Sequence, residues 1–139
     1  KPGFTTRSGV KVIMSKERQR VMDAATTGIG HSDSEYYRLN VEYAMRLTNT
    51  GEFVHAAPWS VGSQGRANVS HGCIGMSLSN AAWLYEHSEV GDVVAVTGTD
   101  RAQDLGNGIT VWNEPWPLWL ARSAVGPIIT EPLPALVGG

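Results

Sequence analysis

The stretch that decides the fold runs from residue 53 to residue 77 and reads FVHAAPWSVGSQGRANVSHGCIGMS. Its first residues are mostly apolar and are stopped by Pro58, which predicts a strand with His55 near its end. Its last part, SHGCIG at residues 70–75, places Cys73, the only cysteine of the chain, in a turn flanked by glycines. A strand end that faces a glycine turn can bring an imidazole close to a thiol. The stretch therefore predicts a β fold with a candidate cysteine site.

Outward from this stretch, the other segments also favour strands. The 16 glycines and 7 prolines leave short segments between them, too short for long helices. Residues 37–47 (YRLNVEYAMRL) alternate with the period of a half-buried strand, although residues 44–47 also fit a helical turn. We expect further strands at residues 10–16, 51–58 and 92–98, the last of them buried. The sum is a mainly β, sandwich-like domain of mixed strands with one or two short helices.

One helix is expected after the glycine turn, over residues 79–88 (SNAAWLYEHS). Ser77 or Ser79 can accept hydrogen bonds from its first free N–H groups. Trp83 and Leu84 are expected to face the core.

A tryptophan-rich segment follows, in which Trp112, Trp116 and Trp119 recur at helix-like spacings. We expect it to pack on the domain as an aromatic plug, with a carbohydrate-stacking surface as the alternative. The division is therefore a domain over residues 1–111 and a packing segment with an extended tail over residues 112–139.

Size and charge restrict the function. A chain of 139 residues with 42% hydrophobic content fits one globular domain. The net charge of −2 gives no electrostatic basis for binding nucleic acid. No apolar run reaches the ~18 residues of a membrane span, so a membrane link is expected only through an N-terminal anchor outside this chain. The basic cluster KERQR at residues 16–20 is expected in a solvated loop or turn.

The chemistry of the turn follows from its residue types. Thiolate is the nucleophilic form of cysteine, so Cys73 needs a base. Both His55 and His71 are candidates, and transfer of the thiol proton to an imidazole would leave an ion pair. Gly72 and Gly75 allow backbone N–H groups to converge on an oxyanion. The alternative interpretation is a zinc site in which both histidines and the cysteine are ligands, with His31 or an aspartate as a candidate fourth ligand.

Residues 53–77 resemble the signature of the L,D-transpeptidases, bacterial enzymes that crosslink peptidoglycan through a catalytic cysteine. That signature is a histidine, a spacer of this length, and Ser/Thr-His-Gly-Cys. The resemblance extends over nearly the whole chain and is strongest to the mycobacterial members. Residues 21–28 (VMDAATTG) are similar to their substrate-covering lid. The first strands of the family's catalytic domain are expected to precede Lys1.

The resemblance implies a role for each matching residue. Cys73 is the nucleophile, and His55 is the general base and later the acid, oriented by the carbonyl of Ala56. The backbones of His71 and Gly72, with the Cys73 amide, contribute to the oxyanion site. Implied substrate contacts come from Tyr37, Met22, Trp59, Ser70 and Gly75. Ordinary core packing is the alternative interpretation for Tyr37, Met22 and Trp59.

Two positions depart from the family pattern. Ala56 stands where serine is frequent, which keeps the carbonyl and removes a hydroxyl. Gly75 stands where asparagine or arginine is frequent, which removes a polar side chain beside the nucleophile.

The resemblance implies no metal and no cofactor. It implies peptidoglycan stem peptides as donor and acceptor, carbapenem β-lactams as covalent inhibitors, and a place on the extracytoplasmic side of the cell envelope. Three alternatives stay open. The first is a cysteine hydrolase of the papain or cell-wall endopeptidase type, but these have Cys before His in the chain, and here His55 precedes Cys73. The second is a sortase, which needs a suitably placed arginine after the Cys. Residues 74–139 hold only Arg101 and Arg122, neither in a clear strand. The third alternative is a degenerate, weakly active or non-catalytic cell-wall binding module.

Overall fold

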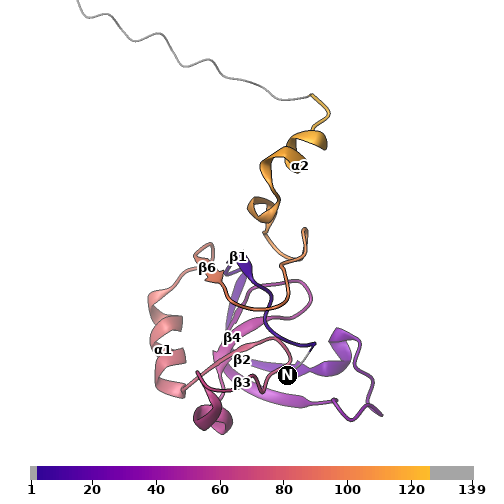
Figure 1. The fold of residues 1–139 in the computed structure, drawn as a ribbon. Helices are drawn as coiled ribbons and strands as arrows, with labels where there is room; N and C mark the ends of the chain where they lie inside the picture. Colours follow the sequence, from indigo (N-terminus) through magenta and orange to yellow (C-terminus); the bar gives the residue numbers. More distant parts are fainter. Residues whose placement is uncertain (1–2, 126–139) are drawn as a thin grey trace, which may run out of the picture.

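The computed structural model describes residues 3–125 and arranges them in two β-sheets with short helices around them (Figure 1). The smaller sheet pairs β1 (Gly9–Val12) with β6 (Val93–Val96) in antiparallel orientation. The larger sheet has the order β2–β3–β4–β5, and its strands are β2 (Ser15–Asp23), β3 (Arg38–Arg46), β4 (Phe53–Ala56) and β5 (Ile74–Met76). Because β4 and β5 are parallel and the other neighbours antiparallel, this sheet is mixed. The predicted mainly β class is confirmed.

β2 and β3 form a long antiparallel hairpin, joined by a loop that contains the 3-10 helix η1 (Ala24–Thr27). Residues 44–46 continue β3, so the alternative of a helical turn there is wrong. Val41 and Met45 are buried as the alternation predicts, but Ala44 is buried too and shares a core cluster with Val41, whereas Met45 belongs to another. Between Val41 and Ala44, Tyr43 has φ +55°, so the backbone leaves the regular strand conformation there and a simple alternation describes only part of the strand.

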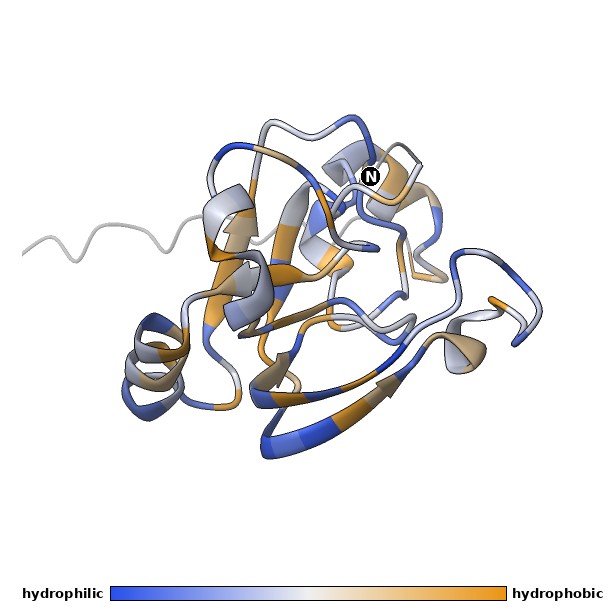
Figure 2. Cartoon of the chain, turned by 90° about the horizontal axis from the view of Figure 1, so that it is seen from below, coloured by the Kyte–Doolittle hydropathy of each residue, from blue (hydrophilic) through white to orange (hydrophobic). Residues whose placement is uncertain are grey.

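The basic cluster at residues 16–20 lies within β2, so the expectation of a loop is wrong. β2 is an edge strand of the larger sheet, where charged side chains are common because they discourage pairing with other chains. Figure 2 shows this hydrophilic stretch along the outer strand. The guanidinium of Arg18 lies over the ring of Tyr43, 4.4 Å from its centroid, and that of Arg20 lies over Phe53 at 5.0 Å.

The expected strand over residues 10–16 is two strands, because the chain leaves the smaller sheet at Ile13 and enters the larger one at Ser15. Ile13 is 2% exposed and joins the main core at this crossing. β6 is not a buried strand as expected. It pairs with β1 at the surface, and the Val93 side chain is 65% exposed.

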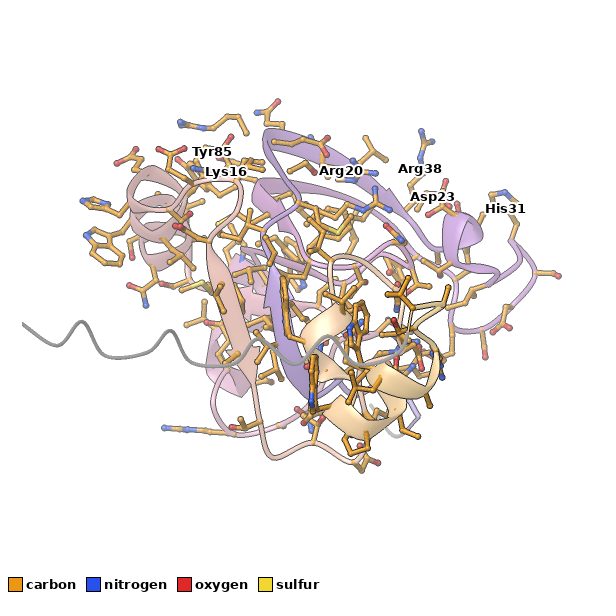
Figure 3. The ribbon with its side chains drawn as sticks, turned by 90° about the horizontal axis from the view of Figure 1, so that it is seen from above. Lys16, Arg20, Asp23, His31, Arg38 and Tyr85 are labelled. Atoms are coloured by element: carbon orange, nitrogen blue, oxygen red, sulfur yellow. The ribbon has the colours of Figure 1, made fainter. Side chains whose placement is uncertain are left out.

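The predicted helix is present as α1 (Leu78–His87), and the Oγ of Ser77 accepts from the Asn80 N–H. Ala81, Leu84 and Tyr85 contact the cores. Trp83 does not, contrary to expectation: it is 61% exposed and stacks on His87. At the other end of α1, the Nζ of Lys16 donates to the carbonyls of Tyr85 and Ser88, which joins the helix to β2 (Figure 3).

The tryptophan-rich segment forms η3 (Val111–Asn113) and α2 (Trp116–Ala121). The Nε1 of Trp112 donates to the Val10 carbonyl at 3.0 Å, so the start of the segment contacts β1. α2 extends away from the sheets (Figure 1), and Trp116 and Trp119 are 66% and 43% exposed. The expected aromatic plug is therefore wrong for these two side chains.

Residues 126–139 of the expected tail lie outside the described part of the chain, and the division at residue 111 stays a prediction. Within residues 3–125, no helix combines the length and the apolar character needed to cross a bilayer.

Two hydrophobic clusters support the larger sheet on either side of β4. The first contains Ile13, Met45, Leu47 and Val54. The second contains Met22, Val41, Ala44 and Phe53, and Tyr37 and Cys73 pack against it. The candidate nucleophile is therefore anchored to a core cluster.

Candidate active site

The parallel pairing of β4 and β5 brings the two predicted catalytic side chains to one face of the sheet. His55 in β4 is opposite Gly75 in β5, and Cys73 lies two residues before Gly75. Because side chains alternate along a strand, positions 73 and 75 share a face with position 55. Both His55 and Cys73 line one cavity of about 350 Å³. Gly75 lines the same cavity and adds no side chain to it.

The imidazole of His55 is 6% exposed, and its Nδ1 lies 2.7 Å from the carbonyl oxygen of Ala56. A carbonyl only accepts, so Nδ1 carries the proton and Nε2 is the basic nitrogen. Burial lowers the pKa of His55, and the hydrogen bond to Ala56 opposes that effect. The carbonyl contact expected at position 56 is present, and the loss of the serine hydroxyl does not disturb it.

The pKa of Cys73 shifts in the opposite direction to that of His55. Burial raises the pKa of its thiol to about 11, a backbone hydrogen bond from Phe53 opposes this, and the carboxylate of Glu52 adds to it. The Sγ donates to the carbonyl of Gly51 at 3.7 Å. Because the pKa of the thiol is raised and that of the imidazole is lowered, both groups are neutral at neutral pH. The expected ion pair is therefore not the resting state of the site.

The turn before Cys73 is closed by Ser70. Its Oγ donates to the Cys73 carbonyl at 2.7 Å and accepts from the Gly72 N–H at 3.3 Å. Ser70, expected to contact substrate, thus uses its hydroxyl to hold the turn. Gly72 has φ +112°, and a Cβ there would lie 3.5 Å from the Glu52 side chain and from the Phe4 carbonyl. Glycine is required at this position, and its N–H reaches an oxyanion only by leaving the long hydrogen bond to Ser70.

The residues predicted to contact substrate all line the cavity, namely Tyr37, Met22, Trp59, Ser70 and Gly75. Contact with a substrate itself stays a prediction. Burial raises the pKa of Tyr37, so its hydroxyl stays protonated and can donate. Met22 is 8% exposed and belongs to the core, which confirms the packing interpretation, and its contact with substrate stays a prediction. Trp59 is 56% exposed with its ring 6.2 Å from that of His55, which excludes plain core packing.

Gly75 fits tightly. A Cβ at this position would lie 3.0 Å from the Cβ of Ala57 and 3.9 Å from the Nε2 of Gln64. Gln64 itself donates to the Ala57 carbonyl at 3.1 Å. An amide group therefore stands beside the position where the family pattern has a polar side chain. Sequence reasoning missed Gln64, because it lies in the spacer of the signature, where only the length is part of the pattern.

The contacts of the His71 side chain do not favour a role as the base. Its Nε2 lies 2.7 Å from the Oε2 of Glu35, and its ring packs between those of Phe4 and Tyr37. Glu35 and Phe4 were also missed by sequence reasoning. Neither belongs to a motif, and only the tertiary fold brings both to residue 71.

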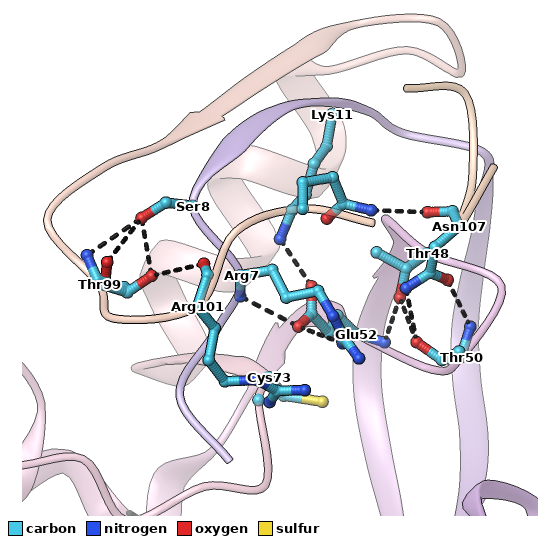
Figure 4. Close-up of polar contacts among 12 residues, drawn as sticks. Arg7, Ser8, Lys11, Thr48, Thr50, Glu52, Cys73, Thr99, Arg101 and Asn107 are labelled. Carbon is cyan, nitrogen blue, oxygen red and sulfur yellow. Dashed lines mark hydrogen bonds and ion pairs between the residues drawn. The ribbon is translucent and has the colours of Figure 1, made fainter. Parts of the chain in front are cut away.

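A buried charge network lies directly behind the turn (Figure 4). Glu52 is 3% exposed, and its carboxylate is 2.6 Å from the Nζ of Lys11 and 3.0 Å from the Nη1 of Arg7. Lys11 is fully buried. The two cations compensate a negative charge that would otherwise oppose ionisation of Cys73 more strongly.

The zinc interpretation finds no support in this geometry. Within residues 3–125, no three His, Cys, Asp or Glu side chains are grouped so that they could hold a metal ion together. His71 is paired with Glu35, and His31 lies in the β2–β3 loop, where its ring contacts Tyr36 at 4.6 Å.

Comparison with known proteins agrees with this site. Residues 1–96, which include β4, β5 and the turn, match the YkuD family, the L,D-transpeptidase catalytic domain. The chain belongs to this family. L,D-transpeptidase 2 of Mycobacterium tuberculosis is 40% identical over 125 residues, 89% of this chain. L,D-transpeptidase 1 of the same organism is 52% identical over 98 residues, 70% of this chain.

A solved L,D-transpeptidase in complex with imipenem superimposes with a TM-score of 0.68 at 52% identity, covering 70% of this chain and 45% of that one. The present chain spans 31% and 39% of the length of the two curated L,D-transpeptidases. It thus corresponds to the catalytic part of longer relatives.

Proposed function

We propose that this chain is the catalytic part of a peptidoglycan L,D-transpeptidase, which crosslinks stem peptides through a thioester on Cys73. The observation that carries the proposal is the placement of His55 and Cys73 on one face of the β4–β5 pair, open to one cavity. The neutral state of both groups at rest supports a reaction in which the proton moves as the substrate is attacked.

In the first half-reaction, the Sγ of Cys73 attacks a carbonyl carbon of the donor stem and its proton passes to the Nε2 of His55. The developing oxyanion accepts from backbone N–H groups of the turn and from the Tyr37 hydroxyl. The C–N bond to the terminal D-alanine then breaks, and His55 returns the proton to the leaving amine. The product is a thioester on Cys73 and free D-alanine.

In the second half-reaction, an amine of the acceptor stem attacks the thioester carbon. The expected amine is that of a diaminopimelate side chain. His55 takes a proton from this amine and returns it to the sulfur, which leaves as the C–S bond breaks. The new amide is the crosslink, and the site is again neutral.

The segment at residues 21–28 is proposed to be the lid that keeps water from the thioester. Met22 lines the cavity on this side. The backbone N–H of Ala24 donates to the Tyr37 carbonyl at 2.9 Å, which ties the start of η1 to the residue whose ring lines the cavity. Closure over this region would shield the acyl group until the acceptor arrives.

The proposed partners follow from the same site. Stem peptides serve as donor and acceptor, and carbapenems acylate Cys73, as the imipenem complex of a relative suggests. Peptidoglycan lies outside the cytoplasmic membrane, so the proposed location is the extracytoplasmic side of the cell envelope.

Mass spectrometry of the protein mixed with a disaccharide-tetrapeptide tests the proposal. We expect an acyl adduct on Cys73, release of D-alanine, and loss of both in Cys73→Ala. Release of D-alanine by Cys73→Ala would contradict the assignment. The alternative of a non-catalytic wall-binding module is suggested by the exposed Trp116 and Trp119. It predicts sedimentation with insoluble peptidoglycan and no adduct on Cys73.

A further inference from the structure

The imidazole of His71 is held from several directions, and two of the residues around it, Glu35 and Phe4, have no part in the proposed chemistry. Its Nε2 is 2.7 Å from the Oε2 of Glu35, and its side chain is 15% exposed. The ring of Tyr37 lies at 4.8 Å with an interplanar angle of 34°, and that of Phe4 lies at 5.0 Å edge to face. Two segments distant in the sequence, the N-terminal segment and the β2–β3 loop, therefore meet on one ring.

Glu35 is itself fixed by its own loop. Its backbone N–H donates to the Oδ1 of Asp33 at 2.8 Å, and the Tyr36 N–H donates to the Asp33 carbonyl. The carboxylate position is therefore set by the loop as well as by His71. Since a carboxylate only accepts, the contact selects the Nε2–H tautomer of a neutral imidazole.

We propose that Glu35 is a positioning residue for the oxyanion site. It acts by orienting the imidazole of His71. This imidazole contacts the Tyr37 ring, and the backbone of His71 is part of the Ser70–Cys73 turn. The proposal rests on the proposed function, because the turn N–H groups and the Tyr37 hydroxyl are the donors to be aligned. Such donors must lie about 3 Å from the developing oxyanion, so a small shift of either one slows acylation.

The consequence is a link between loop and turn. Tyr37 lies just before β3 and the turn lies just before β5. These two strands are not neighbours in the sheet, so no sheet hydrogen bond joins Tyr37 to the turn directly. The Glu35–His71 contact and the stacked rings provide this connection. Without the carboxylate, we expect the imidazole to rotate and the Tyr37 hydroxyl to lose its defined direction.

Acylation kinetics with imipenem test the proposal, using Glu35→Ala, Glu35→Gln and the control Glu86→Gln, which removes one exposed carboxylate on α1. We expect Glu35→Ala to lower the limiting acylation rate about tenfold with little change in the half-saturating concentration. Glu35→Gln keeps an oxygen acceptor for Nε2–H and should restore most of the rate. Glu86→Gln should react like the wild type.

The tautomer of His71, read by nitrogen NMR at mildly alkaline pH, supplies a second readout that does not depend on activity. We expect the Nε2–H tautomer in the wild type and in Glu35→Gln, and a mixture in Glu35→Ala. A wild-type limiting rate in Glu35→Ala, or an unchanged tautomer, would overturn the inference alone. A wild-type protein that imipenem does not acylate at Cys73 would overturn the proposed function along with it.

Discussion

Among single residues, Cys73 and His55 matter most, because burial keeps both of these proposed reactive groups neutral. Burial raises the pKa of Cys73 to about 11 and lowers that of His55. A thiolate exposed to solvent between turnovers would react with oxidants and other electrophiles. Keeping the proton on sulfur until a carbonyl is in place confines the nucleophile to the moment of attack.

The pH dependence of thiol alkylation measures the pKa of Cys73 in the folded protein. For the folded protein we expect the iodoacetamide rate to keep rising with pH toward about 11, whereas the urea-unfolded chain levels off above the ordinary value of 9.0. Because the folded pKa is the higher one, this group's contribution to stability is complete below pH 9.0 and is lost as pH rises toward about 11. In urea titrations, Cys73→Ser should not lose stability in this pH range, because it has no thiol to ionise. A folded-state midpoint at or below 9.0 would contradict the burial argument.

At the scale of elements, the pairing of β4 with β5 forms the site, and α1 stabilises that pair from outside. α1 follows β5 after a single residue, Ser77, which caps it. Its last carbonyls accept from Lys16, a residue of the edge strand β2. The helix is thus bound at both ends to the sheet that carries the proposed catalytic residues.

Removal of the amino group in Lys16→Met should leave these carbonyls without their cationic donor. We expect a loss of about 1 kcal/mol or more in the free energy of unfolding, measured by urea denaturation. Gln19→Met, at an exposed position of the same strand, is the matched control and should change it little. Equal effects of the two substitutions would mean that the C-terminal contact does not stabilise α1.

At the scale of the whole molecule, the Arg7–Glu52–Lys11 network joins the N-terminal segment, the smaller sheet and the start of β4. Lys11 belongs to β1, and its Nζ reaches Glu52 just before β4. A buried carboxylate is costly unless it is paired, so the two sheets are coupled through this contact.

Lys11→Met should therefore cost roughly 3 kcal/mol or more in the free energy of unfolding, because it leaves Glu52 buried with one partner fewer. The double variant Lys11→Met/Glu52→Gln should recover part of that loss. Arg38→Met, which removes an exposed cation 3.7 Å from Asp23, should cost less than about 1 kcal/mol. Strict additivity in the double variant would contradict the coupling of the sheets by this pair.

Sequence patterns alone were enough to predict the strand class and the helix after the turn, and they placed one histidine and one cysteine at what the structure shows to be a common cavity. These are local properties: the alternation of residues 37–47, the cap at Ser77, and a motif whose residue types carry the chemistry. It also indicated the orienting carbonyl of Ala56, since every residue keeps its carbonyl whatever its side chain.

Only the tertiary structure decided which side chains are buried and which charges meet. Trp83 was expected in the core and lies in solvent, while Lys11 is fully buried against Glu52. The contact of Glu35 with His71 spans 36 residues and has no sequence signal. Burial and ion pairing are sums over neighbours from many segments, so the pKa values that keep the site neutral arise only when the chain has folded.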